Sequence, residues 1–116
     1  MNGQNSTFEE FWPFYVSQHL NPVNRRLHFY GTTIALVLVI VALIWRAPFV
    51  AVAAIAAAYS FAWAGHFFFE KNRPATFIYP WLSVRADFRM YRLTLFNEMD
   101  TEILMLTKEM KALRGG

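Results

Sequence analysis

Three histidines and one nearby glutamate are the side chains of this sequence best suited to chemistry. The chain of 116 residues has no cysteine, and its only histidines are His19, His28 and His66. Glu70 follows His66 by four residues, so the two share a face if this segment is helical. Imidazole and carboxylate groups are ligands for first-row metals, including the iron of non-haem oxygenases, whereas a structural zinc site usually needs cysteine. We therefore consider a metal site at these four residues.

Two long uncharged runs carry or border these residues, and they predict a pair of membrane helices. Residues 27–45 and 47–69 contain 19 and 23 residues without a formal charge, in a chain that is 56% hydrophobic and only 16% charged. At about 1.5 Å per residue, each run reaches roughly the 30 Å thickness of a hydrocarbon core. The runs predict helices over residues 22–46 and 47–70 with a tight turn between them. A buried hairpin in a soluble helical bundle is the alternative.

The hairpin geometry brings two of the histidines to one level. His28 lies 18 residues before Arg46, and His66 lies 20 residues after it. Both are therefore roughly 27–30 Å from the turn. His19 precedes the Asn-Pro break at residues 21–22, where a reversal of the chain would bring it to the same end. Membrane-boundary anchoring of single histidines and haem ligation by two of them are the alternatives to a metal site.

Flanking segments predict shorter helices around the hairpin. Residues 7–20 read as an amphipathic helix with an aromatic face, started by a capping box at Ser6 or Thr7, or begun only after Trp12 because of Pro13. Residues 80–96 predict an interfacial helix, and residues 97–114 an amphipathic tail helix. The expected fold is an all-α single domain over residues 1–116, with self-association through 47–70 or 97–114 as one option.

Basic residues predict the orientation of the hairpin. Eleven lysines and arginines are present, and only Arg46 lies in the turn between the two apolar runs. The positive-inside rule then places both termini in the cytoplasm. Arginines of the 80–96 segment alternate with apolar residues instead of forming a clean basic face, so nucleic acid is not an expected partner. Membrane lipid is the expected surroundings.

Two motifs of the sequence resemble a known family. The stretches HLNPVNRRLHFYGT (19–32) and WAGHFFFEKNRPATFIYP (63–80), followed by DFRMY (87–91), resemble the Mpo1-like family, and the resemblance extends through most of residues 8–96. It implies a membrane-embedded iron(II)-dependent dioxygenase that shortens 2-hydroxy fatty acids by one carbon, with O2 as co-substrate. It also implies that His19, His28 and His66 bind Fe²⁺. The length of the chain is similar to that of short bacterial members, which implies the bacterial inner membrane.

Further residues receive roles around this implied centre. A 2-hydroxy acid would keep its carboxylate and hydroxyl at the headgroup level, where arginine can pair with a carboxylate through two hydrogen bonds. The expected substrate-binding residues are Asn24, Arg25, Arg26 and Arg73. Glu70 and Asp87 are the expected catalytic carboxylates, each able to hold a histidine N–H and fix its tautomer. The alternative function is a non-enzymatic membrane scaffold that binds lipid or a partner.

Overall fold

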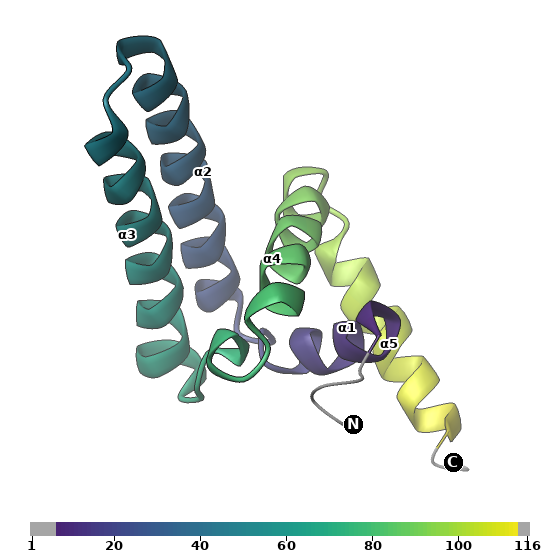
Figure 1. Cartoon of the computed structure of the whole chain (residues 1–116). Helices are drawn as coiled ribbons and strands as arrows, with labels where there is room; N and C mark the ends of the chain where they lie inside the picture. The colour runs from purple at the N-terminus through teal and green to yellow at the C-terminus, as the bar shows by residue number, and fades with distance from the viewer. Residues whose placement is uncertain (1–6, 114–116) are drawn as a thin grey trace. The chain divides into compact units, whose positions relative to one another are not determined.

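The structure is a computed structural model that describes residues 7–113 (Figure 1). These residues form helices and the turns that join them, and no strand occurs among them. The prediction of an all-α fold is confirmed. The chain groups into two compact units, one of residues 21–74 and one made of the residues up to Leu20 together with those from Ala75 onward.

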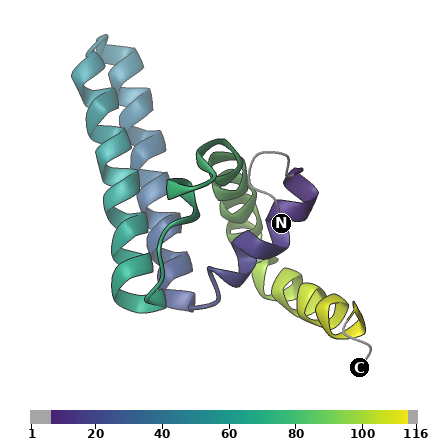
Figure 2. The ribbon, with the colours of Figure 1, turned by 60° about the horizontal axis from the view of Figure 1, so that its bottom comes forward.

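The first unit, residues 21–74, is a helical hairpin. Helix α2 (Pro22–Trp45) and helix α3 (Pro48–Ala64) run antiparallel and lie side by side in both ribbon views (Figures 1 and 2). A π-helix, η1 (Gly65–Glu70), continues the chain directly from α3. The expected single helix over residues 47–70 is therefore two helical segments with different hydrogen bonding. An apolar run carries no local signal for this change, since its side chains suit either helix type.

Local chemistry at the helix ends explains where the hairpin helices begin and end. The Asn21 side chain accepts a hydrogen bond of 2.8 Å from the Val23 N–H, and Pro22 occupies the first helical turn, where its missing N–H costs nothing. Helix α2 ends at Arg46, whose φ of 52° lies in the left-handed region. The Ala47 N–H then donates to the Ala42 carbonyl over 2.9 Å and closes the turn.

Two glycines allow the hairpin helices to approach closely. A Cβ at Gly31 would lie 2.7 Å from the Phe61 Cβ, which is closer than carbon atoms tolerate. A Cβ at Gly65 would lie 2.0 Å from the Asn24 side-chain oxygen and 3.1 Å from the Asn24 Cα. Small residues at helix crossings give the close packing that holds helices together in lipid. Gly65 therefore brings the start of η1 against the first turns of α2.

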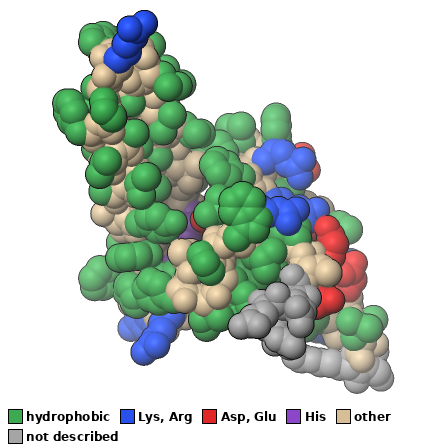
Figure 3. Space-filling model, in the orientation of Figure 1, with side chains coloured by type: hydrophobic (Ala, Val, Ile, Leu, Met, Phe, Trp, Pro, Cys, Tyr) green, Lys and Arg blue, Asp and Glu red, His purple; other side chains and the backbone are tan. Residues whose placement is uncertain are grey.

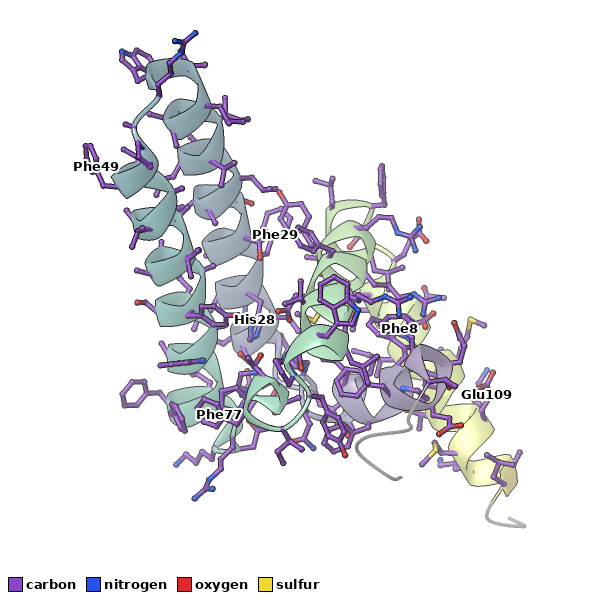
Figure 4. All side chains as sticks on the ribbon, viewed as in Figure 1. Phe8, His28, Phe29, Phe49, Phe77 and Glu109 are labelled. Carbon is purple, nitrogen blue, oxygen red and sulfur yellow. The ribbon has the colours of Figure 1, made fainter. Side chains whose placement is uncertain are left out.

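The two hairpin segments have the length and apolarity of membrane-spanning helices. Residues 22–45 and 48–70 have mean hydropathies of 2.3 and 1.5 in their most apolar windows, of which only 17% and 11% is buried. Figure 3 shows hydrophobic side chains over the visible face of the hairpin. Phe49, 76% exposed, points away from α3 in Figure 4. Core helices of a soluble bundle would be mostly buried, so this exposure favours the membrane hairpin over that alternative.

The second unit packs short helices around an aromatic core. It contains α1 (Phe8–Ser17), a 3₁₀ turn η2 (Ala75–Phe77), α4 (Pro80–Leu95) and α5 (Met99–Leu113). These helices match the predicted ones, although α1 ends three residues earlier than expected. The core residues come from every one of these elements: Phe11, Trp12, Tyr15, Val16, Ala75, Ala86, Met90, Leu93 and Met99.

Helix α1 starts at Phe8 despite the proline within it. The Thr7 side chain accepts a hydrogen bond of 3.2 Å from the Glu10 N–H, so the Thr7 capping alternative is the one formed. Ser6, the other capping residue considered, lies outside the described residues. A proline inside a helix costs about 3 kcal/mol. Burial of Phe11 and Trp12 before Pro13 and of Tyr15 after it offsets this cost, so a start after Trp12 is not adopted.

Two arginines of α4 lie against aromatic rings of α1. The Arg85 guanidinium is 4.6 Å from the centre of the Phe8 ring, and the Arg89 guanidinium is 4.9 Å from that of Trp12. Such cation–π contacts contribute about 0.5–1 kcal/mol at exposed sites. The Trp12 indole N–H also donates to Glu102 of α5 over 2.6 Å. The aromatic face predicted for residues 7–20 thus packs on partner helices of its own unit.

Candidate metal centre

His28 and His66 face each other across the hairpin. His28 lies in the second turn of α2, where Figure 4 labels it, and His66 lies in η1. Their ring centroids are 4.9 Å apart with the ring planes nearly perpendicular at 86°, and both side chains are buried, with 8% and 2% exposed. The arithmetic that placed these two histidines at one level is confirmed. The pair is close enough for both imidazoles to reach one ion.

A π-helix and a glycine position His66 in this arrangement. The wider turn of η1 changes the direction of side chains that follow α3, and such segments often occur at functional sites. Gly65, immediately before His66, lies against Asn24 of α2 with no space for a Cβ. Asn24 stands one helical turn before His28. The same close contact therefore sets the spacing of the two histidine-bearing backbones.

Hydrogen bonds at Nδ1 indicate which ring nitrogen of each histidine carries the proton. The His28 Nδ1 lies 3.0 Å from the Asn24 backbone carbonyl, and the His66 Nδ1 lies 2.7 Å from the Asn72 side-chain oxygen. A backbone carbonyl only accepts, so the His28 Nδ1 must carry the proton and donate it. The His28 Nε2 then keeps the lone pair that a metal ion needs. Metal-binding histidines characteristically donate their other ring N–H in this way.

His19 follows the same pattern in the other unit. Its Nδ1 lies 2.6 Å from the Tyr15 backbone carbonyl, so Nδ1 is again the protonated nitrogen. Its ring stacks on the Tyr15 ring with centroids 4.0 Å apart and planes inclined by 22°. These two contacts fix the orientation of the ring at the end of α1. Each histidine of the chain thus offers one ring nitrogen as a possible metal ligand.

Asp87 is connected to His19 through Tyr15. The Tyr15 hydroxyl donates a hydrogen bond to the Asp87 carboxylate, and the same Tyr15 bonds and stacks with His19. Burial raises the pKa of Asp87 from 3.8 to about 7, against the smaller opposing effect of the bond from Tyr15. Burial, and then the neighbouring Asp87 charge, raise the pKa of Tyr15 well above 10. Tyr15 therefore remains a donor at neutral pH.

Glu70 joins the end of η1 to the start of α2. Its carboxylate accepts a hydrogen bond from the Asn21 backbone N–H, and the Asn21 side-chain amide donates to the Phe69 carbonyl over 3.1 Å. A carboxylate at a helix N-terminus also interacts favourably with the helix dipole. Glu70 therefore contacts Asn21, the residue that caps α2. Asn21 follows His19 by two positions in the sequence.

The predicted substrate-binding residues lie at the same end of the hairpin. Asn24 is fully buried, and neither side-chain polar atom has a hydrogen-bond partner among the described residues. Arg25 and Arg26 follow it in the first turns of α2, half-buried and exposed respectively. Arg73 lines a crevice of about 470 Å³ with four other residues of the turn after η1: Phe67, Phe68, Lys71 and Asn72.

Asn72 is a site residue that the sequence reasoning missed. Its side chain is the hydrogen-bond partner of His66, and its backbone N–H donates to the His66 carbonyl over 3.0 Å. A signal was present in the motif H-F-x-x-E-x-N, in which this asparagine follows His66 by six residues. The spacing alone gives no reason to expect a contact, because it depends on how the chain turns after Glu70.

A comparison with protein families decides the relationship of the chain. A family profile described as "2-hydroxy-palmitic acid dioxygenase Mpo1-like" matches residues 5–99. The chain belongs to the Mpo1-like family. Comparisons with curated proteins and with solved structures gave no match. The profile covers both histidine-bearing motifs and most of the second unit of this Mpo1-like chain, and it ends at Met99, where α5 begins.

Proposed function

We propose that this Mpo1-like chain is a membrane-embedded, non-haem iron(II) dioxygenase that shortens 2-hydroxy fatty acids by one carbon. The observation that carries the proposal is the common hydrogen bonding of the three histidines, each with its Nδ1 on an oxygen atom. This arrangement leaves three Nε2 atoms as ligands, and imidazole nitrogen suits iron. Bound iron would supply the activation of O2, which the side chains of this protein cannot provide.

The covalent chain supports the inclusion of His19 with the facing pair. Asn21 is fixed to the end of η1 by its bonds with Glu70 and Phe69. His19 lies two residues before Asn21, so its Cα is within about 7 Å of the Asn21 Cα whatever the conformation between them. Glu70 itself belongs to the same short π-helix as His66. In this proposal, Glu70 holds the chain so that His19 reaches the other two histidines.

The remaining predicted residues receive roles that fit their surroundings. Arg25, Arg26 and Arg73 are the basic groups proposed to pair with the substrate carboxylate, and Arg73 borders the crevice after η1. The buried carboxamide of Asn24, which has no hydrogen-bond partner among residues 7–113, suits the 2-hydroxyl group because an unsatisfied buried polar group is costly. Asp87 acts indirectly in the proposal: it holds Tyr15, which orients His19.

The apolar surface of the hairpin suits a lipid-like substrate. The histidine pair lies at the end of the hairpin away from the Arg46 turn, and hydrophobic side chains cover the length between. A fatty acid could thus keep its polar head at the pair while its tail remains in lipid. The hydroxy acid and O2 would give the acid that is one carbon shorter, carbon dioxide and water. This reaction balances in atoms, and O2 takes up the four electrons.

Metal analysis and oxygen uptake test the proposal together. Protein purified in mild detergent should contain iron near one equivalent, and it should consume O2 with 2-hydroxypalmitate. Unsubstituted palmitate is the matched control substrate, because it lacks only the hydroxyl group. Protein that holds no iron, and that shows no uptake after iron(II) is added, would contradict the enzyme and leave the scaffold or lipid-binding alternative.

A further inference from the structure

The turn after η1 folds the chain back onto His66. Lys71 has a φ of 60°, in the left-handed region that residues other than glycine rarely occupy. The N–H groups of Lys71 and Asn72 both donate to the His66 carbonyl, and the second bond is 3.0 Å long. This conformation costs about 1 kcal/mol or more for a residue with a Cβ. Its result is that the Asn72 side chain meets the His66 ring.

His66 differs from the other two histidines in the kind of acceptor at its Nδ1. His19, just after α1, and His28, within α2, each use the backbone carbonyl of the residue four positions earlier. The corresponding carbonyl for His66, that of Ala62, accepts from the Gly65 N–H at the change from α3 to η1. His66 instead uses the side-chain oxygen of Asn72, at 2.7 Å. At His66, in the π-helix, a side chain thus takes the place that a backbone carbonyl has at the other two histidines.

Because of this difference, Asn72 determines which ring nitrogen of His66 carries the proton. A backbone carbonyl only accepts, whereas a carboxamide presents an oxygen or an NH2 group according to its orientation. With the oxygen toward the ring, His66 carries its proton on Nδ1, and its Nε2 carries the lone pair that a metal ion needs. With the NH2 toward the ring, Nδ1 would be the acceptor and Nε2 would carry the proton. The orientation of one amide thus determines whether His66 can act as an Nε2 ligand.

We propose that Asn72 is a positioning residue that holds His66 in its Nδ1–H form and so prepares Nε2 to bind the metal ion. Metal binding by the His66 Nε2 rests on the proposed function, whereas the Nδ1–H tautomer of His66 does not. An acceptor-only side chain at position 72 should preserve the effect, and a side chain without an acceptor should remove it. Both backbone bonds to the His66 carbonyl persist in such variants, because they do not involve the side chain.

Nitrogen NMR of the metal-free protein tests the tautomer directly. With ¹⁵N-labelled histidine, long-range ¹H–¹⁵N spectra at mildly alkaline pH show which ring nitrogen carries the proton, and only three histidines contribute signals. We expect the Nδ1–H form at His66 in the native protein and in Asn72→Asp, and a mixture of both tautomers in Asn72→Ala. Asn97→Ala is the control, because Asn97 is an exposed asparagine in a left-handed turn after α4.

A second measurement connects the tautomer to metal affinity. Loss of a residue that orients a metal ligand typically costs 10- to 100-fold in affinity, so Asn72→Ala should weaken iron(II) binding by that factor and Asn72→Asp should not. An Nε2–H form in the native protein, or an unchanged His66 tautomer in Asn72→Ala, would overturn the inference while iron binding, and the proposed function, could still stand. Conversely, the expected tautomers in a protein that binds no iron would contradict the proposed function alone.

Discussion

The three histidines differ in their backbone setting and agree in their hydrogen bonding. His19 follows the end of an α-helix, His28 lies inside an α-helix and His66 lies in a π-helix, yet each has an oxygen acceptor at Nδ1. Histidines that serve only as packing groups have no reason to share one protonation pattern. Agreement between two histidines bonded to a backbone carbonyl and one bonded to a side chain is therefore the argument at the residue scale for the proposed metal site.

His66→Gln should remove metal binding without unfolding the hairpin. The glutamine keeps a polar group of similar size, but it cannot supply the imidazole lone pair. Iron content after purification should fall at least tenfold, and the far-ultraviolet circular dichroism should stay helical. Tyr30→Phe, at an exposed position of α2, is the control and should bind iron normally. Unchanged iron content in His66→Gln would remove this residue from the site.

Asp87 should make the stability of the metal-free protein depend on pH. Its pKa is about 7 in the folded protein and near 3.8 when exposed, so the folded state holds the proton more tightly. The contribution of Asp87 to stability is then greatest below about pH 4, decreases as the pH rises to 7, and disappears above that. Thermal unfolding from pH 4 to 8 measures this trend. Asp87→Asn should flatten it, because asparagine stays neutral and still accepts from Tyr15.

Glu109→Gln is the control for that experiment. Glu109 is an exposed carboxylate on α5, labelled in Figure 4, and its neutralisation should leave the pH trend in place. A melting temperature that depends on pH in the same way in the native protein and in Asp87→Asn would contradict the buried state of the Asp87 carboxyl.

At the scale of the elements, close contacts between helices control the histidine spacing. Gly65→Ala would put a methyl group 2.0 Å from the Asn24 oxygen and 3.1 Å from its Cα, so side chain and backbone must both move. Overpacking of this kind costs about 1–3 kcal/mol. We expect a lower melting temperature together with weaker iron binding. Ala56→Leu, on an exposed face of α3, adds more volume than Gly65→Ala and should change neither the melting temperature nor iron binding. This control distinguishes the close contact at Gly65 from a general effect of added volume.

Helix positions were predictable where a residue carries local chemistry. The start of α2 is indicated by Asn21 and Pro22. Prolines also occupy the first positions of α3 and α4, at Pro48 and Pro80. The π-helix was not predictable, because the hydrogen-bond shift at Gly65 depends on its contact with Asn24 across the hairpin. The partner of His66 was missed for the same reason: Asn72 reaches it only through the left-handed turn at Lys71.

At the scale of the whole molecule, the apolar hairpin and the basic residues around it predict an orientation in the membrane that can be measured. The native sequence contains no cysteine, so single-cysteine variants report one position each without background. Ala47→Cys, in the turn between α2 and α3, should react with a membrane-impermeant maleimide from outside intact cells. Glu109→Cys on α5 should react only after the membrane is opened.

The opposite labelling pattern would reverse the proposed orientation. Reaction of both positions from outside intact cells would contradict two membrane crossings with the termini together in the cytoplasm. Protein recovered in the soluble fraction without detergent would contradict the membrane hairpin itself, whatever the labelling shows.

The order of the units along the chain has a consequence for biosynthesis. The hairpin unit of residues 21–74 is inserted between the two chain segments that make up the other unit. Helix α1 therefore leaves the ribosome with Phe11, Trp12 and Tyr15 uncovered, and the last residue of the core that buries them, Met99, is made more than 80 residues later. At about 5–20 residues per second, this delay lasts about 4 to 17 seconds. During that interval the aromatic face of α1 lacks its core partners, and in the proposed membrane protein the bilayer surface is an apolar environment that can cover it.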